Sequence, residues 1–376
     1  MRWGIFMNKT SIVILSYNTY KLTKFCIESI RKYTPAGSYE IIVIDNASQD
    51  ESVAWLKEQN DIRLVCNEEN KGFPAGCNQG MAMAEQGNDI LLLNSDTIVT
   101  PRWLENLQTA LYSEPKVGAV SCITNSCSNW QQVEVNYQNY DELIAFAEKI
   151  NHSNPTLWEI RPRLVGFCYL IKNEAYQIAG FLDERYAPGN YEDDDYSLKL
   201  IMAGYKLLVC GDTFIHHYGS ASFGKHTTPE EQAEKARKYA ALLQRNQGLF
   251  VEKWQVTPDY GAVHNVIFDV SIPKEDVARI FVVGCNMGMD ICYLQNKYPY
   301  AQISGATENW MEAALAGKYL DVSYCPNLEQ DIFTLLTGKY DYILLAEKDR
   351  QYEDFDGYIA KLMEYLAPEG SINISE

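Results

Sequence analysis

The chain has 376 residues, enough for two domains, and with 47% hydrophobic and 22% charged residues it has an ordinary globular composition. Its formal net charge of -18 excludes a general nucleic-acid binder, which needs a basic surface, but allows a small anionic ligand held by backbone amides or by a metal ion. No apolar run approaches the ~20 residues of a membrane span, so we expect no transmembrane segment.

The ten cysteines are scattered singly, and no C-x-x-C pair occurs that would indicate a zinc ribbon or a thioredoxin motif. We interpret them as reduced thiols and expect a cytoplasmic protein. The N-terminal segment has too short an apolar run for a signal peptide, and Met7 is a second possible start.

Short apolar runs alternate with helical patterns in the first third of the chain. Strands are predicted at 11–16, 40–46, 62–67 and 89–94, and helices at 19–33, 50–59 and 74–86. Continuous apolar strands that alternate with helices predict a parallel sheet covered on both faces.

Each of these predicted strands ends in polar residues. They are Ser16-Tyr17-Asn18, Asp45-Asn46, Asn67 and Asn94-Ser95-Asp96. One polar strand end is typical of a turn. Because the carboxyl ends of parallel strands share one edge of the sheet, several such ends predict a ligand site there.

Further along, 117–160 is rich in Asn, Ser, Tyr and Trp and predicts loops and short strands on the acceptor side. The stretch 164–180 predicts a strand followed by a helix, and 191–210 a helix followed by a strand. A long helix is predicted over 228–247, with Pro229 in its first turn and Gly248 just past its end.

Near 256–270 the alternation restarts. Four further strands at 278–285, 301–306, 340–346 and 370–375, with helical patterns between them, predict a second α/β domain. We therefore expect one domain over 1–256 and another over 257–376.

Four clusters carry candidate chemistry. Asp96, after a buried strand, offers the oxygen ligand that Mg²⁺ and Mn²⁺ prefer beside phosphate oxygens, and a turn is the alternative. His216 and His217 end an apolar strand and are either metal ligands or structural. Gly72 lies in a glycine-rich turn that enters a helix, where a phosphate is attracted, although the segment is not a P-loop and is also compatible with an ordinary loop.

The fourth cluster is the acidic run Glu192–Asp195 at a helix start. One or two carboxylates there are explained by capping and by the helix dipole. Four adjacent like charges repel one another, so we expect at least one to serve another purpose. Side chains one position apart on a helix point about 100° apart, so the four acids cannot all face one site.

Taken in order, these motifs resemble the family 2 glycosyltransferases, with the closest similarity to rhamnosyltransferase-like and galactofuranosyltransferase-like bacterial members. The segments that carry the resemblance are "SIVILSYN", "IIVIDNASQD", "NKGFPAGCNQG", "LLLNSDT", "GFLDERY", "NYEDDDYSLKLIMAGYK" and "FIHH". They extend from Thr10 to about Gly224, and we expect the helix up to Trp254 to continue the same domain. The resemblance implies a GT-A fold, a nucleotide-diphosphate-sugar donor, Mn²⁺ or Mg²⁺ and inverting hexosyl transfer.

The resemblance also implies roles for particular residues. Asp96 would carry most of the metal binding, because Asn94 stands where the family has the first acid of Asp-x-Asp, and His216 would be the distal metal ligand. Asp193 falls where the family has its catalytic base, so the resemblance implies that it faces the site as the general base, while Asp195 points away and Glu192 and Asp194 flank the helix entrance. Donor contacts are expected from Ser16, Tyr17, Asn18, Asp45, Asn46, Gly72, Asn78, Asn94 and Ser95.

The last third of the chain resembles a class I methyltransferase fold. It departs from that pattern at Val282, Asn286 and Thr307, and it stops at Glu376 before two expected strands. We expect an incomplete Rossmann-like domain kept for structure or partner contact. An S-adenosylmethionine-dependent methyltransferase and a docking or oligomerisation module are the alternatives.

Two other functions compete with glycosyl transfer. A nucleotidyltransferase would carry a glycine-rich loop with Arg and Lys after the first strand, which "LSYNTYKLTKF" lacks. A non-catalytic nucleotide-sugar-binding module is favoured if the acidic helix faces away from the nucleotide. The acceptor, whether a glycan, a lipid-linked sugar or a protein, and the formation of a homo-oligomer are left open.

Overall fold

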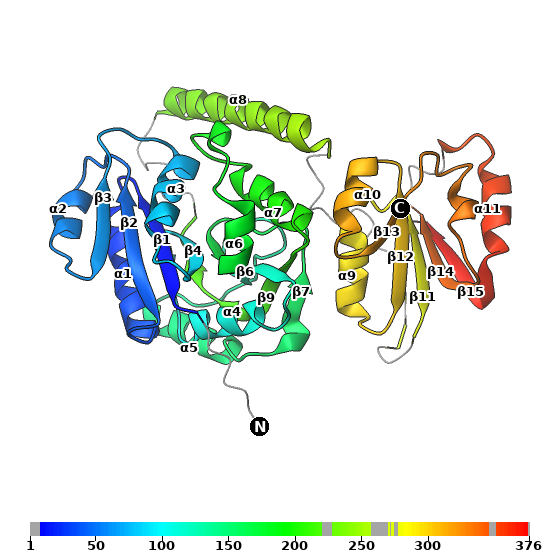
Figure 1. The fold of residues 1–376 in the computed structure, drawn as a ribbon, viewed down its shortest axis with the longest axis horizontal. Helices are drawn as coiled ribbons and strands as arrows, with labels where there is room; N and C mark the ends of the chain where they lie inside the picture. Colours follow the sequence, from blue (N-terminus) through cyan, green and yellow to red (C-terminus); the bar gives the residue numbers. More distant parts are fainter. Residues whose placement is uncertain are drawn as a thin grey trace. The chain divides into compact units, whose positions relative to one another are not determined.

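In the computed structural model, residues 8–219, 228–256, 270, 272–273, 277–345 and 351–374 are described. The chain divides into two compact units (Figure 1). The N-terminal unit comprises Met1–Trp158 and Arg163–Phe250, and the C-terminal unit comprises Glu159–Pro162 and Val251–Glu376. The expected domain boundary lies after residue 256, and 257–269 are outside the described residues. Residues 220–224, the last part of the segment that carries the family resemblance, are outside them as well.

An eight-stranded sheet of order β3-β2-β1-β4-β8-β6-β9-β7 forms the centre of the N-terminal unit. Its first four strands pair in parallel, and the apolar residues Ile12, Val43 and Leu91 at their centres are fully buried. Burial on both faces explains the continuous apolar runs. These strands are β1 (Thr10–Ser16), β2 (Tyr39–Asp45), β3 (Ile62–Cys66) and β4 (Asp89–Asn94).

β8 (Cys168–Ile171) runs opposite to both of its neighbours in this sheet. It is antiparallel to β4 and to β6, and Cys168 pairs with Leu93 near the end of β4. Gly166 and Phe167, which precede β8, therefore reach the edge where the parallel strands end. The remaining strands are β6 (Val117–Ile123), β7 (Trp158–Ile160) and β9 (Lys206–Phe214).

A small sheet of two antiparallel strands begins directly after Asp96, a residue of the predicted site. β5 (Thr97–Ile98) pairs with β10 (His216–His217), so that His217 stands opposite Thr97. The short pair brings the two histidines next to the end of β4.

Helices of the N-terminal unit connect and cover these strands (Figure 1). α7 begins at Glu192, as the acidic run predicts. The helices are α1 (Tyr20–Tyr33), α2 (Ser52–Lys57), α3 (Phe73–Met83), α4 (Trp103–Leu111), α5 (Tyr140–Ile150), α6 (Asn173–Ala179), α7 (Glu192–Met202) and α8 (Pro229–Trp254), with 3-10 turns η1 (Pro155–Leu157) and η2 (Glu184–Tyr186).

The long helix α8 does not end where the sequence predicts. It continues through Gly248 to Trp254, and Phe250 and Trp254 beyond the glycine are buried. Burying two aromatic side chains outweighs the roughly 1 kcal/mol that a glycine costs inside a helix. The predicted end at residue 247 is therefore wrong.

The C-terminal unit is built on a five-stranded, all-parallel sheet of order β13-β12-β11-β14-β15. After three strands that step outward, the chain returns to the middle for β14, which is the doubly wound, Rossmann-like arrangement. Its elements are β11 (Arg279–Val283), α9 (Met289–Lys297), β12 (Gln302–Thr307), α10 (Trp310–Ala316), β13 (Asp321–Tyr324), η3 (Ile332–Thr334), β14 (Tyr340–Leu345), α11 (Phe355–Met363) and β15 (Leu366–Ile374).

Hydrophobic clusters lie on both faces of the second sheet. Ile280 and Val282 belong to one cluster, and Phe281 and Val283 to the other. The prediction of two α/β folds in succession is thereby confirmed. All ten cysteines are free thiols. No helix within the described part of the chain has the length and apolar character required to cross a membrane.

Candidate active site

The ends of β1 and β2 place a buried carboxylate at the edge of the sheet. Asp45 is fully buried, and its Oδ1 accepts a hydrogen bond of 2.9 Å from the backbone N–H of Ser48. Its Oδ2 is buried without a protein hydrogen-bond partner. Because such groups are rarely left unsatisfied, this oxygen is suited to accept a hydrogen bond from a ligand. Ser16, at the end of β1, lies 3.2 Å from the hydroxyl of Thr23.

The two residues after Ser16 differ in accessibility. Tyr17 is 41% exposed, so its ring is available to a ligand. Asn18 adopts a left-handed conformation with φ 54°. Its N–H donates to Ser48 Oγ, and its Oδ1 accepts from Gln49 N–H, so it ties the end of β1 to the loop after β2.

Asn46 organises the glycine-rich loop that enters α3. Its Oδ1 accepts from the Lys71 N–H at 3.0 Å, and its Nδ2 donates to Asn70 Oδ1 and to the Gly72 carbonyl. Gly72 has φ 83° and ψ 171°, a conformation that only glycine adopts readily. The predicted donor-binding residues Asn46 and Gly72 therefore form one hydrogen-bonded unit.

Asn78, also predicted to contact the nucleotide, is buried in α3 and bound to the protein itself. Its Nδ2 donates to the Leu182 carbonyl and to Glu184 Oε1, and its Oδ1 accepts from the Leu182 N–H. These bonds occupy most of its hydrogen-bonding capacity and attach α3 to the segment before η2.

At the end of β4, Asp96 pairs with a histidine. Asp96 Oδ1 lies 3.3 Å from His217 Nε2, and the Nδ1 of the same ring lies 2.7 Å from the Ser126 carbonyl oxygen. The carbonyl requires a proton on Nδ1, so the neutral ring presents its Nε2 lone pair toward Asp96. Asn94 Nδ2 is 3.5 Å from the same Nε2, and Ser95 Oγ lies 3.3 Å from the Thr19 hydroxyl.

Burial opposes the charged form of His217, but the hydrogen bond to Asp96 and the charge of that carboxylate outweigh it and raise the pKa of the ring. The neighbouring His216 behaves differently. Burial and the adjacent His217 lower its pKa to about 4. Its Nδ1 lies 2.6 Å from the Tyr137 hydroxyl.

The histidine beside Asp96 is thus His217, whereas the family resemblance implies His216 as the metal ligand. Successive side chains of a strand face opposite sides, so one histidine of β10 turns toward Asp96 and the other toward Tyr137. Two potential ligands, Asp96 and His217, therefore stand together. Within the described residues no group of three or more His, Cys, Asp or Glu side chains is arranged to hold a metal ion.

The acidic helix reaches the same edge of the sheet through the start of β8. Asp193 Oδ2 accepts a 2.9 Å hydrogen bond from the Gly166 N–H. The next residue, Phe167, stacks its ring on His217 with centres 5.3 Å apart, and its carbonyl accepts from the Asn94 N–H. Gly166 and Phe167 therefore connect Asp193 with the Asp96–His217 pair.

The other three acids of α7 are more deeply buried than Asp193. Burial above all, and then the charge of Asp193, raise the pKa of Glu192 well above its ordinary value. Asp194 forms an ion pair of 2.8 Å with Arg163. Asp195 is fully buried beside the Tyr186 hydroxyl. Asp193 is therefore the most accessible of the four.

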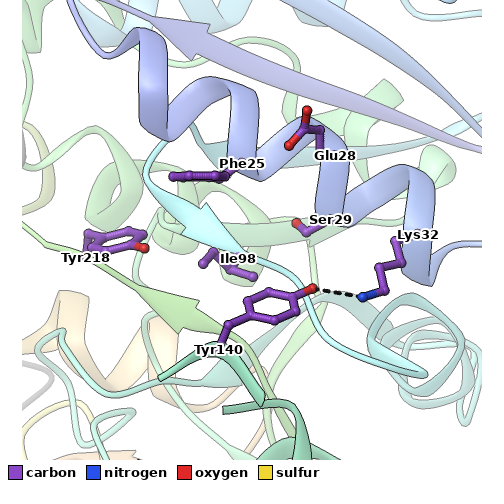
Figure 2. A pocket seen from close by; sticks show the side chains of 7 residues that line it. All are labelled: Phe25, Glu28, Ser29, Lys32, Ile98, Tyr140 and Tyr218. Atoms are coloured by element: carbon purple, nitrogen blue, oxygen red, sulfur yellow. Dashed lines mark hydrogen bonds between the residues drawn. The ribbon is translucent and has the colours of Figure 1, made fainter. Parts of the chain in front are cut away.

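A cavity of about 470 Å³ opens between α1 and the β5–β10 pair. Figure 2 shows Phe25, Tyr140 and Tyr218 around it, with the Lys32 ammonium 3.4 Å from the Tyr140 hydroxyl. Ile98 of β5 and Tyr218, the residue after His217, line the cavity, but neither Asp96 nor His217 does.

The sequence does not single out Gly166 and Phe167, and it does not show that His217 rather than His216 lies beside Asp96. The available signal is the "VGF" that precedes a short apolar run. These residues reach the site only because β8 is antiparallel to β4, and the sequence does not indicate that direction.

Comparison with known proteins finds a family match within the N-terminal unit. Residues 11–176 match the family described as Glycosyl transferase family 2. The chain is 32% identical over 135 residues to "Glycosyltransferase GlyG" of Streptococcus pneumoniae serotype 4, covering 35% of this chain and 42% of that protein. It is 21% identical over 240 residues to "O-antigen chain rhamnosyltransferase RfbN" of Salmonella typhimurium, covering 60% of this chain and 70% of that protein.

The chain spans 27% and 42% of the length of two of the curated relatives that it matches. Among solved structures, GalNAc-T7 with UDP, GalNAc and Mn²⁺ has a TM-score of 0.46 at 18% identity, with 57% of this chain and 44% of that one covered. Residues 11–176, which match the family model, include strands β1 to β4 with Asp45 and Asp96 and continue through β8 into α6. Residues 11–176 of the N-terminal unit are therefore similar in sequence to glycosyl transferase family 2.

Proposed function

We propose that this chain is a metal-dependent, inverting glycosyltransferase that moves a hexosyl group from a nucleotide-diphosphate sugar to an acceptor hydroxyl. The observation that carries the proposal is the connection of Asp193 to the Asp96–His217 pair through Gly166 and Phe167. A potential base and a potential cation site then lie at one edge of a family 2 domain.

The donor nucleotide binds at the ends of β1 and β2 in this proposal. The orphaned Oδ2 of Asp45 accepts a hydrogen bond from the nucleotide, and the exposed Tyr17 offers a ring face. Ser16, Asn18 and Asn46 shape the surrounding loops. The Gly72 turn, Asn78, Asn94 and Ser95 complete the predicted donor site, where Asn78 acts from within the protein.

The residues fit a divalent cation. Asp96 supplies a carboxylate oxygen and His217 a neutral Nε2 whose ring is oriented by the Ser126 carbonyl. Mg²⁺ and Mn²⁺ accept few protein ligands and complete their coordination with water and phosphate oxygens. When bound, such an ion neutralises charge on the departing diphosphate.

Asp193 is the proposed general base. Its carboxylate takes the proton of the acceptor hydroxyl while that oxygen attacks the anomeric carbon, and the bond to the nucleoside diphosphate breaks on the opposite face. The Gly166 N–H orients one carboxylate oxygen. A single displacement needs no second carboxylate nucleophile and inverts the anomeric configuration.

The acceptor is a glycan, a lipid-linked sugar or a protein. A nucleotidyltransferase would join a nucleoside triphosphate to a sugar phosphate, and a binding module would leave the donor intact. A panel of UDP-, GDP- and dTDP-sugars incubated with Mn²⁺ distinguishes these functions. We expect slow donor hydrolysis and thermal stabilisation by one nucleoside diphosphate. Binding of that diphosphate without any turnover, with acceptors supplied, would contradict the proposal.

A further inference from the structure

The chain enters the acidic helix through a loop in an unfavourable backbone conformation. Gly189, Asn190 and Tyr191 have φ values of 156°, 75° and 75°, and Tyr191 is the left-handed residue directly before α7. Two successive residues with side chains in this region are costly, so the surroundings must hold the loop in place. Asp193 is only two residues away.

A single side chain of α8 binds this loop at three points. Asn246 is fully buried, and its Nδ2 donates to the carbonyl oxygens of Tyr186, Gly189 and Asn190 at 2.8, 2.9 and 2.9 Å. Its Oδ1 accepts from the guanidinium of Arg245, which fixes the orientation of the amide. Asn246 therefore satisfies carbonyl groups on both sides of the turn.

Neighbouring residues of α8 support the same loop. The Arg245 guanidinium also donates to the Ala187 carbonyl, and the Tyr239 hydroxyl donates to Asn190 Oδ1. The Tyr191 ring packs on Phe250 with centres 5.7 Å apart. Most other residues of α8 between 230 and 245 are exposed. The contacts with the loop are therefore among the few that this part of the helix makes with the N-terminal unit.

The opposite side of the loop touches the predicted donor site. The Phe73 N–H donates to the Pro188 carbonyl at 2.8 Å, and a Cβ on Gly72 would lie 2.9 Å from the Pro188 Cα. The loop is therefore held between the start of α3 and α8. Its position fixes where α7 begins.

We propose that Asn246 is a positioning residue for sugar transfer: it holds the 186–191 loop so that Asp193 faces the acceptor. The inference rests on the proposed role of Asp193 as the base and adds a residue that touches neither substrate. Removing the amide frees the strained turn and lets Asp193 shift. Since misplacement of a catalytic group by about 1 Å can cost 10²-fold in rate, we expect kcat of Asn246→Ala to fall ~10- to 100-fold.

The matched control is Gln108→Ala. Gln108 is another buried amide on a helix, and it donates to the Asn8 carbonyl and the Thr10 hydroxyl at the start of β1, the far edge of the sheet. Both variants lose buried hydrogen bonds, so both are compared below their own melting temperatures. We expect Gln108→Ala to keep kcat, and Asn246→Ala to lose kcat while the KM for donor and the affinity for nucleoside diphosphate with Mn²⁺ stay within threefold.

The double variant Asp193→Asn/Asn246→Ala separates positioning from general destabilisation. If Asn246 acts through Asp193, the double variant is no slower than Asp193→Asn alone, because two changes in one unit are not additive. Multiplied losses, or a parental kcat in folded Asn246→Ala, would overturn the inference. Equal losses in Gln108→Ala would overturn it as well.

Hydrogen exchange tests the same inference without any turnover. In Asn246→Ala, amides of 186–195 should exchange faster while those of β1 stay unchanged. If no nucleotide sugar is a substrate, or if Asp193→Asn is fully active, the proposed function fails instead. In that case unchanged exchange in 186–195 refutes the positioning role, and faster exchange confined to this segment supports it.

Discussion

The ring of Phe167 stacks on the imidazole of His217 at 5.3 Å, with the two planes 18° apart. The contact links the strand that follows Gly166 to the strand that carries the two histidines. It also limits rotation of the His217 ring, whose Nδ1 is already bound to the Ser126 carbonyl. The Nε2 atom is thus kept on the side of Asp96 before any ligand arrives.

The two adjacent histidines should respond differently to substitution. His217→Ala and Asp96→Ala remove the proposed cation ligands, so each should lose most of the Mn²⁺-dependent part of nucleoside diphosphate binding, measured by calorimetry with and without the metal. His216→Gln should retain it, because His216 Nδ1 faces the Tyr137 hydroxyl. The reverse order, with His216 essential and His217 dispensable, would restore the assignment expected from the sequence.

Asp193→Asn tests the base. An amide of the same shape cannot accept the proton, so transfer should fall ~10²- to 10⁴-fold while donor and metal binding persist. Asp195→Asn is the comparison from the same helix. Asp195 is fully buried next to the Tyr186 hydroxyl, so its substitution should act on thermal stability rather than on kcat. Full activity of Asp193→Asn, or a stable but inactive Asp195→Asn, would refute the assignment.

Glu192 should make the protein less stable as the pH rises. Burial and the charge of Asp193 raise its folded-state pKa well above 4.5, so above that pH the folded chain holds a proton that the unfolded chain has lost. Stability then falls with pH by up to about 1.4 kcal/mol per unit until the folded pKa is passed. Glu192→Gln mimics the neutral form. Its advantage over the parent in chemical denaturation should grow from pH 5 upward, and an unchanged difference would exclude a protonated Glu192.

Gly72→Ala should be far more costly than Gly37→Ala. Both glycines have positive φ, at 83° and 89°, but a Cβ on Gly37 meets no atom within 4 Å, whereas one on Gly72 would lie 2.9 Å from the Pro188 Cα. We expect Gly37→Ala to cost ~1–2 kcal/mol, and Gly72→Ala on the order of 3 kcal/mol or more, with weaker donor binding. Urea denaturation of both variants measures the difference, and equal costs would contradict the close approach.

The C-terminal unit should not bind S-adenosylmethionine tightly. At the end of β12, where a ribose-binding acid is expected, the Thr307 hydroxyl donates to Glu312 Oε2, and Glu308 Oε1 accepts from the Leu328 N–H. These carboxylates are already engaged within the unit. Calorimetry on the full chain should detect no S-adenosylmethionine binding at ligand concentrations up to ~10⁻⁴ M. A micromolar Kd would refute the non-catalytic interpretation.

The fold could be predicted where one physical signal dominates. The fully buried runs around Ile12, Val43 and Leu91 specify strands, and the acids before Tyr196 mark the start of α7. Gly248 misleads, because local propensity indicates a helix end while burial of Phe250 continues the helix. Tertiary packing decides such cases, and a sequence pattern does not display it.

The site divides in the same way. Asp45 and Asp96 are recognisable because each follows an apolar strand, whereas the choice of Asp193 within the acidic run rests on the family resemblance. The choice between His216 and His217 depends on which side of β10 faces β4, a matter of strand register. The role of Asn246 depends on a loop of unusual backbone geometry about 60 residues earlier, which its own helix does not reveal.

The position of β8 has a consequence for the nascent chain. β8 lies between β4 and β6 in the sheet, so one edge of β4 has no partner strand between the synthesis of Asn94 and the emergence of Ile171 from the ribosome. At ~5–20 residues per second this interval lasts several seconds. During it, Leu91 and Leu93 belong to a strand without a neighbour on that side. A chaperone that covers the unpaired edge of β4 during this interval would protect the nascent chain from aggregation.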